Sequence, residues 1–198
     1  MSQLVLASTS PYRKALLEKL GLPFETRSPN IDESPLQGES PAALVARLAE
    51  AKARAIAPEF CDALIIGSDQ VAVLENKILG KPGNHQAAVE QLRHASGKRV
   101  DFLTGLCLYN TKTRHAQVSV VPYTVVFREL SLEEIDDYLR REQPYDCAGS
   151  FKSEGLGIAL FQGMEGEDPN ALIGLPMIEL CRLLAENGMA ILGEAVAR

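Results

Sequence analysis

Hydrophobic residues follow one another without a break in two runs near the middle of the chain, at residues 63–66 and 71–74. Consecutive rather than alternating apolar residues are typical of a strand that helices cover on both faces, as in α/β sheets. The first run meets Gly67, so we expect a buried strand to end there and to present Asp69 and Gln70 at its end. Ligands of α/β sheets bind at such strand ends.

Asp69 allows two interpretations. Glycine, serine and aspartate cluster in turns for backbone reasons alone, and taken by itself this is the simpler explanation. The second apolar run is followed by the polar residues 75–77 and then by Gly80, Lys81 and Pro82. A hairpin through the polar turn would bring Lys81 back near Asp69. A carboxylate with a lysine suits a metal ion and phosphates, although a plain ion pair would give the same pattern.

The rest of the pattern alternates strands with helices, which predicts the α/β class and one domain over residues 1–198. The helix starts carry cap residues followed by proline or by a capping box, and glycine follows the helix ends. Residues 148–157 are rich in glycine and are expected to form a loop. Strands are expected at 4–7, 23–27, 78–79, 100–109, 118–127 and 158–161, and helices after the caps Ser10, Ser40, Asn84 and Ser131 and from Pro176.

The first predicted strand leads into the first helix through residues 8–10. The free amides at a helix start attract anions, so Ser8 lies where a phosphate would bind. Arg13 in the first turn adds a positive charge. Arginine opposes the dipole preference at this helix end, which an anionic partner would explain; on local grounds a solvated helix charge explains it equally well.

Two further candidates lie between the second strand and the central run. Asp32 and Glu33 occupy a proline-bounded loop and suit a metal ion, although a solvated acidic loop is the commoner case. Lys52 stands among alanines on the second helix, where a long cation reaches over small neighbours. A solvated lysine is the simpler local interpretation.

Composition narrows the classes of function. The chain has 198 residues, of which 46% are hydrophobic, so it is expected to form a well-buried core. The net charge of −6 argues against a protein that grips polymeric nucleic acid, because that task needs a basic face. No stretch has the length of a signal peptide core or a membrane span, so a cytoplasmic protein without membrane contact is expected. The four cysteines are widely spaced and are interpreted as core residues.

Several familiar chemistries are excluded by their missing motifs. The sequence has no G-x-S-x-G elbow, and the Gly97-Lys98 pair lacks the remainder of a phosphate-binding P-loop. The three histidines have no paired spacing, which disfavours a histidine-based zinc site or a catalytic triad. Oxygen ligands, cations and a helix start remain as the candidate chemistry.

Seven short stretches, taken in order, resemble the Maf family of nucleoside triphosphate pyrophosphatases over essentially the full length. Each stretch is weak by itself, and the ordered set is highly specific. The resemblance implies a two-lobed Maf/inosine-triphosphatase-like fold with a central mixed sheet, flanking helices and an active-site cleft. It also implies a cytoplasmic, homodimeric enzyme. The matching stretches are residues 6–13, 32–33, 50–53, 67–70, 80–82, 96–97 and 147–151.

The resemblance also implies roles for individual residues. The activity would be metal-dependent release of pyrophosphate from a nucleotide, with Mg²⁺ or Mn²⁺ as the divalent cofactor, and it would remove non-standard nucleotides from the pool. A nucleotide-binding regulator of cell division with incidental hydrolysis is the alternative from another class. Family roles map onto Ser8, Arg13, Lys52 and Lys81 as phosphate contacts and onto Glu33 and Asp69 as metal or water partners. Asp69 is the expected catalytic residue, either as general base or through a metal-bound water.

The base preference is inferred from Tyr12, Gln70 and Glu154, which resemble the specificity positions of the branch that acts on 7-methylguanosine triphosphate. Methylation at N7 leaves the purine positively charged, and a cationic ring stacks on an aromatic face such as that of Tyr12. Glu154 would accept from the guanine N1 and N2 donors, and Gln70 would pair with another polar edge. A dTTP or UTP pyrophosphatase is the alternative within the family.

Overall fold

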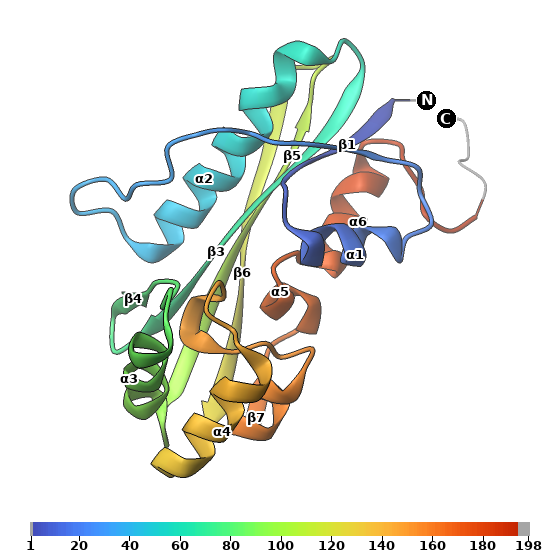
Figure 1. Cartoon of the computed structure of the whole chain (residues 1–198). Helices are drawn as coiled ribbons and strands as arrows, with labels where there is room; N and C mark the ends of the chain where they lie inside the picture. The colour runs from blue at the N-terminus through green and yellow to red at the C-terminus, as the bar shows by residue number, and fades with distance from the viewer. Residues whose placement is uncertain (1, 194–198) are drawn as a thin grey trace. The chain divides into compact units, whose positions relative to one another are not determined.

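The computed structural model of this chain describes residues 2–193. It is an α/β structure, as the hydrophobic pattern predicted, and its mixed sheet is flanked by helices (Figure 1), as the family resemblance implied. The strand order is β2-β1-β3-β5-β6-β7, and β4 pairs with β3. Strand β1 is parallel to β2 and β3. Strand β4 runs antiparallel to β3, and β7 runs antiparallel to β6. The strands are β1 (Gln3–Ala7), β2 (Glu25–Arg27), β3 (Ala63–Leu74), β4 (Lys77–Leu79), β5 (Arg99–Asn110), β6 (His115–Phe127) and β7 (Phe161–Glu165).

The helices begin where the sequence predicted. The side chains of Ser10, Ser40 and Asn84 each accept a hydrogen bond from a backbone N–H in the first turn of their helix. Ser131 and Glu134 form the complete capping box. The helices are α1 (Pro11–Glu18), α2 (Pro41–Ile56), α3 (His85–Ala95), α4 (Leu132–Glu142), α5 (Pro169–Ile173) and α6 (Met177–Glu186), with short 3-10 helices η1 (Ala57–Glu59), η2 (Ala148–Ser150) and η3 (Leu156–Leu160).

The described residues divide into two compact units. Unit 1 comprises residues 2–70, 104–121 and 174–193, and unit 2 comprises residues 71–103 and 122–173. Strands β3, β5 and β6 contribute to both units. No helix of the described residues is long and apolar enough to cross a membrane.

In unit 1, helix α2 lies on one face of the sheet and α1 and α6 lie on the other (Figure 1). Small residues of α2 pack against β1, β3 and β5 in a closely fitted core. The inward face predicted for α6 is confirmed, because its apolar residues at 177, 180, 183 and 184 are all buried. The α2-facing core consists of Val5, Ala7, Ala49, Ala53, Ile56, Ala63, Ile65, Cys107 and Tyr109.

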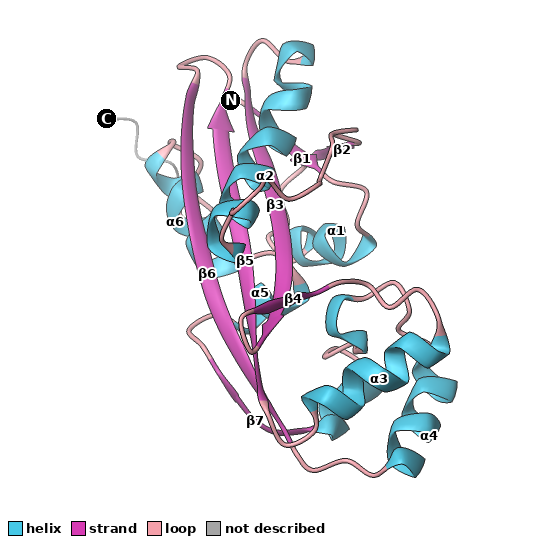
Figure 2. Ribbon diagram, turned by 90° about the vertical axis from the view of Figure 1, so that its left-hand side faces the viewer, coloured by secondary structure: helices cyan, strands magenta, loops and turns pink. Residues whose placement is uncertain are grey.

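In unit 2, α3 and α4 lie side by side (Figure 2). Their apolar faces join a core centred on aromatic rings. Phe151 is buried and its ring meets those of Phe102, Phe127 and Phe161 edge to face, with centroids 4.8–5.7 Å apart. Residues 148–157, expected to be only a loop, therefore include two short 3-10 helices and a core anchor.

The prediction that the central strand ends at Gly67 is wrong. Strand β3 continues to Leu74, so Asp69 and Gln70 lie in its middle. The polar residues do not end the strand because their side chains find partners. The hydroxyl of Ser68, for example, is completely buried and lies 2.8 Å from one backbone carbonyl oxygen and 2.9 Å from another.

The strand predicted at residues 158–161 is also wrong. Helix η3 occupies residues 156–160, and β7 begins only at Phe161, which pairs with Phe127. The apolar run does not alternate as a strand would, since Leu160 is buried and Ile158 is 52% exposed. A Cβ atom at Gly157 would lie 2.3 Å from the carbonyl oxygen of Lys152, so the chain folds back tightly there.

The interpretation of the cysteines as core residues holds for Cys107 alone. Cys107 is buried, and this burial raises the pKa of its thiol to about 12. Cys147 and Cys181 are half-buried, and Cys61 is exposed. The cysteine of the central β5 strand is thus the one that sequence context placed correctly.

Candidate active site

Two glycines on neighbouring strands let α2 approach the sheet closely in unit 1. A Cβ atom at Gly67 would lie 2.0 Å from the carbonyl oxygen of Ala49, and one at Gly105 would lie 2.1 Å from that of Val45. Neither position has room for a side chain, and the two carbonyls are about one turn apart on α2. The backbone of α2 therefore lies directly on β3 and β5, which fixes where its side chains reach the sheet.

Lys52 is brought to Asp69 by this close packing. It follows Ala49 by three positions on α2, and Asp69 follows Gly67 by two positions on the same face of β3. The Lys52 Nζ lies 2.7 Å from Asp69 Oδ1 and 2.9 Å from Glu33 Oε1. Lys52 is only 5% exposed and Asp69 only 7%, so the local interpretation of a solvated lysine is wrong. The structure joins three of the candidate residues in one charge cluster.

The loop that carries Glu33 is held by an ion pair that the sequence analysis missed. The Arg47 guanidinium donates to both carboxylate oxygens of Glu39, at 2.6 and 2.8 Å, and to the carbonyl oxygen of Ser34 at 3.1 Å. The Leu36 N–H also donates to Glu39. The Arg47 hydrogen bonds, followed by that from Leu36, lower the pKa of Glu39 to about 2.

Ser8 and Ser10 form the junction between β1 and α1. Ser8 is buried, and its Oγ accepts a hydrogen bond from the Ser10 N–H at 3.1 Å. The Ser10 side chain in turn caps α1 by accepting from the Arg13 N–H. The predicted connection from strand β1 to helix α1 is confirmed, and it places Ser8 next to the first turn of α1.

Arg13 does not project into solvent as an isolated helix charge. Its Nε donates to the carbonyl oxygen of Gly174 at 2.8 Å, and the same carbonyl lies 2.9 Å from the Ser68 hydroxyl. Burial lowers the pKa of Arg13, and the negative charges of Asp69 and Glu33 partly oppose that shift. The guanidinium is therefore held by the chain beside two carboxylates and still carries further N–H donors.

Two of the three proposed specificity residues lie in unit 1. Gln70 is half-buried on β3, and its Nε2 donates to the Oγ1 of Thr104 at 2.9 Å. Tyr12 is half-buried in the first turn of α1. Thr104, a fully buried polar residue on β5, was missed by the sequence analysis because nothing local marks it as a partner of Gln70.

The remaining candidates, Lys81 and Glu154, belong to unit 2 and are exposed on loops. The predicted hairpin before Lys81 is confirmed by the pairing of Leu74 with Lys77. Its turn residues Glu75 and Asn76 have φ angles of 50° and 64°, as a two-residue hairpin turn requires. Glu154 accepts a hydrogen bond from the hydroxyl of the preceding serine. Neither side chain is buried in its own unit.

The carboxylates of Glu33 and Asp69 suit a hard divalent cation. Among residues 2–193 there is no group of three or more histidine, cysteine or acidic side chains that would enclose a metal ion by itself. Mg²⁺, however, is usually held by one or two carboxylates together with waters and substrate phosphates. The donor set fits an ion that is shared with a phosphorylated ligand rather than an all-protein metal cage.

The fold and this site define an α/β protein whose clustered cations and carboxylates suit a small phosphorylated ligand. Comparison with known sequences narrows the class. The chain belongs to the Maf-like protein family, whose model matches residues 3–187. The resemblance inferred from the seven short stretches is thereby confirmed.

Three relatives are similar over nearly the whole chain, and each is named 7-methyl-GTP pyrophosphatase. The protein from Nitrosococcus oceani is 60% identical over 96% of this chain and 95% of its own. Those from Colwellia psychrerythraea and Methylobacillus flagellatus are each 56% identical, covering 98% and 97% of this chain and 97% and 100% of their own.

A solved structure supports the fold independently. The Staphylococcus aureus Ham1 protein superposes with a TM-score of 0.51, covering 93% of this chain and 98% of its own. The sequence identity is 13%, so this likeness concerns the fold alone. It agrees with the expected Maf-type arrangement of a mixed sheet and flanking helices.

Proposed function

We propose that this protein is a nucleoside triphosphate pyrophosphatase that hydrolyses 7-methyl-GTP to 7-methyl-GMP and pyrophosphate. The observation that carries the proposal is the 56–60% identity, over nearly the full chain, to three proteins named for that activity. The cluster of Glu33, Lys52 and Asp69 supplies the chemistry that such a reaction needs.

Asp69 is the proposed general base. A water molecule attacks the α-phosphorus, its proton passes to the Asp69 carboxylate, and the bond to the oxygen bridging the α and β phosphorus atoms breaks. The pyrophosphate leaves with the bonding electrons. Lys52 holds one Asp69 oxygen at 2.7 Å, which fixes the orientation of the carboxylate. A positioned base of this kind contributes about 10²–10⁴-fold to the rate.

Cations are proposed to stabilise the charge that develops on the phosphates. Arg13 and Lys52 are held close to the carboxylates in unit 1, and Ser8 offers its hydroxyl at the start of α1. Lys81 is proposed as a further phosphate contact. Positively charged groups aimed at the leaving group act most strongly where water is excluded, as it is around Lys52.

A divalent ion, Mg²⁺ or Mn²⁺, is proposed as the cofactor. Glu33 and Asp69 would hold it together with phosphate oxygens. Because both carboxylates pair with Lys52, they would bind the ion either through their second oxygens or by giving up the ion pair with Lys52. When bound, such an ion neutralises phosphate charge and lowers the pKa of water. Loss of turnover in excess chelator, with recovery on adding Mg²⁺, is the expected result.

Base recognition is proposed to involve Tyr12, Gln70 and Glu154. The N7-methylated purine is a cation, so an aromatic face and a carboxylate favour it over neutral bases. Thr104 holds the Gln70 amide nitrogen and so orients its carbonyl oxygen. The dimeric state and the cytoplasmic location are proposed from the same family relationship, and gel filtration with light scattering tests the former.

Identification of the products tests the proposal. Purified protein is incubated with 7-methyl-GTP and Mg²⁺, and the products are separated by chromatography and assigned by phosphorus NMR. We expect 7-methyl-GMP and pyrophosphate in equal amounts, formed about 10²–10⁴-fold more slowly by the Asp69→Asn variant. Formation of 7-methyl-GDP and inorganic phosphate would contradict cleavage at the α-phosphorus.

A further inference from the structure

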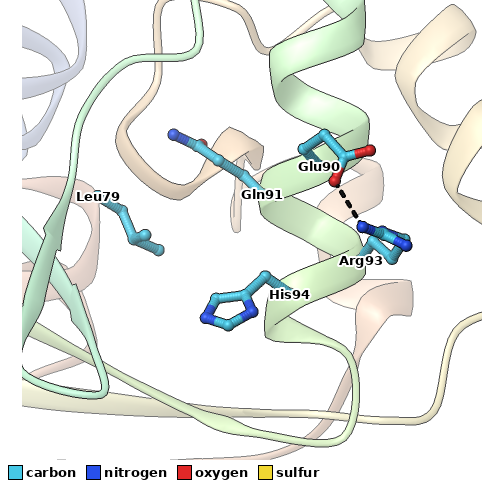
Figure 3. A pocket seen from close by; sticks show the side chains of 5 residues that line it. All are labelled: Leu79, Glu90, Gln91, Arg93 and His94. Carbon is cyan, nitrogen blue, oxygen red and sulfur yellow. Dashed lines mark hydrogen bonds and ion pairs between the residues drawn. The ribbon is translucent and has the colours of Figure 1, made fainter.

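Helix α3 carries a side chain that bonds to two separate loops of unit 2. Gln91 is half-buried, and its Nε2 donates to the carbonyl oxygen of Gly80 at 3.0 Å. Its Oε1 accepts from the hydroxyl of Ser150 at 2.5 Å. Figure 3 shows Gln91 leaving α3 on the side of Leu79, where it lines a pocket.

The chemistry of the two partners fixes the orientation of this amide. A backbone carbonyl oxygen only accepts, so the Gly80 oxygen requires the amide nitrogen of Gln91. The amide oxygen is then left for the Ser150 hydroxyl, which is the donor in that bond. Gln91 is thus used at both ends, and neither a carboxylate nor an apolar side chain of similar size could make both bonds.

Both loops carry residues that the proposed function uses. Gly80 immediately precedes Lys81, the proposed phosphate contact. Ser150 lies four positions before Glu154, the proposed specificity residue, and Phe151 between them is anchored in the aromatic core. The side chain of Gln91 therefore connects a phosphate-binding loop to a base-binding loop within one unit.

The Ser150 loop has a conformation that needs support. Gly149 and Ser150 have φ angles of 75° and 63°, and Ser150 is completely buried. A residue other than glycine is strained in this left-handed region and stays there only where its surroundings hold it. The hydrogen bond from Ser150 to Gln91 is one such restraint.

The neighbouring polar residues of α3 do not make this connection. Glu90 and Arg93 pair with each other at 2.8 Å on the helix surface, as the dashed line in Figure 3 marks. His94 lies 3.1 Å from Glu75 in the β3–β4 turn. Of the side chains drawn there, Gln91 is the one that bonds both to the Lys81 loop and to the Glu154 loop.

We propose that Gln91 is a positioning residue that holds the loops of Lys81 and Glu154 in the arrangement used for substrate. This inference rests on the proposed function. Gln91 acts without contacting the reacting atoms, and its effect passes through Lys81 on one side and Glu154 on the other. A displacement of about 1 Å in a substrate contact is enough to lower the rate as much as 10²-fold.

The test compares Gln91→Met with the wild type. Methionine has a similar size and helix propensity but makes neither hydrogen bond, so the fold should be retained. We expect kcat/KM for 7-methyl-GTP to fall by about 10- to 100-fold, with a protein that remains folded but has a modestly lower Tm, because the buried Ser150 hydroxyl loses its acceptor. Gln86→Ala, a change at an exposed residue of the same helix, is the matched control and should leave both quantities unchanged.

A double-mutant comparison separates positioning from general support of the fold. If Gln91 acts through Lys81, Gln91→Met should cost much less in a Lys81→Met background than in the wild type. Gln91→Glu, which keeps the acceptor for Ser150 but loses the donor for Gly80, should resemble Gln91→Met in its effect on KM. Equal penalties from Gln91→Met in both backgrounds, or a normal kcat/KM in the folded variant, would overturn the inference.

Nucleotide binding, measured without hydrolysis, tests the role of Gln91 separately from the proposed reaction. Calorimetry measures the Kd of 7-methyl-GTP and of GTP for the Asp69→Asn protein with and without the Gln91→Met change. A wild type that binds nucleotide without releasing pyrophosphate would contradict the proposed reaction and still report on Gln91. Unchanged Kd values on changing Gln91 to Met would overturn the inference whatever the reaction is.

Discussion

The candidate residues of unit 1 and those of unit 2 differ in how their charges are held. In unit 1, Lys52 and Asp69 are buried and paired at 2.7 Å, with Glu33 added at 2.9 Å. In unit 2, Lys81 and Glu154 are exposed on loops. Buried charges are kept only where partners compensate the loss of water, so the Lys52–Asp69 pair is held in place, while Glu33 approaches it from an exposed loop. Exposed loop residues adapt more easily to a ligand.

We infer from this difference that the buried pair of Lys52 and Asp69 acts in the chemical step, whereas the exposed Lys81 and Glu154 act mainly by contacting the substrate. A base and the cations around it must be held in place before the reaction, because reorganisation in the transition state is costly. Contacts that only select the ligand tolerate movement. Changes at Lys52 and Asp69 should therefore alter kcat and often stability, whereas changes at Lys81 and Glu154 should alter KM and substrate preference with little effect on stability.

The largest expected difference is between two substitutions that each replace a carboxylate by an amide, one in each unit. Asp69→Asn keeps shape and an oxygen that accepts from Lys52, so the protein should remain folded while kcat falls by about 10²–10⁴-fold. Glu154→Gln should leave kcat within a few-fold and change the preference among nucleotides. Steady-state kinetics with melting curves on the same samples decides this. A well-folded Asp69→Asn variant with normal kcat would show that Asp69 is not the base.

The two lysines sharpen the comparison. Lys52→Met leaves the buried Asp69 carboxylate without its closest cation, and loss of one partner from a buried pair costs about 3–5 kcal/mol. Lys81→Met, at an exposed position, should change stability by no more than about 0.5 kcal/mol. Both should lose activity. Urea unfolding measures the difference, and equal stability losses would mean that burial does not separate the two sets.

The close approach of α2 is tested through Gly67. In Gly67→Ala the new methyl group would meet the Ala49 carbonyl, so α2 must shift, at a cost of about 1–3 kcal/mol or more. Because the shift separates Lys52 from Asp69, activity should fall as well. Gly163→Ala, at a strand glycine with open space around it, is the control. An unchanged Tm for Gly67→Ala would contradict the packing described here.

The smallest expected effect concerns the stability of the fold at acidic pH. The Glu39 pKa is lowered from 4.5 to about 2, mainly by Arg47. A lowered pKa stabilises the fold above the unfolded-state value, and this contribution is lost as pH falls from about 4.5 towards 2. The free energy of unfolding of the Glu39→Gln variant should therefore fall less steeply with decreasing pH over that interval than that of the wild type. Urea midpoints at several pH values test this, and parallel pH profiles for the two proteins would contradict it.

Local signals in the sequence were sufficient for most of the elements. The caps Ser10, Ser40, Asn84 and Ser131 each mark a helix start in the structure. A cap acts over three or four residues, so the sequence displays it completely. The hairpin before Lys81 was predictable for the same reason.

Long-range contacts could not be predicted from local pattern. Lys52 stands in a run that suits a solvated residue, and its burial depends on Gly67 lying 15 positions away on the sheet. Likewise, residues 158–161 have strand-like composition, but the tight approach of Gly157 to Lys152 turns the segment into a 3-10 helix. In the first case a contact between distant segments overrides the local preference, and in the second a tight backbone turn between Lys152 and Gly157 does so.

The most direct test of the central claim is a comparison of kcat/KM for 7-methyl-GTP, GTP, dTTP and UTP on one preparation. A cationic ring on a desolvated aromatic face gains about 2 kcal/mol, so we predict a preference for 7-methyl-GTP over GTP of about 30-fold. The Tyr12→Ala, Glu154→Ala double variant should lose that preference while keeping pyrophosphate release. Equal or faster turnover of GTP, dTTP or UTP by the wild type would contradict the account.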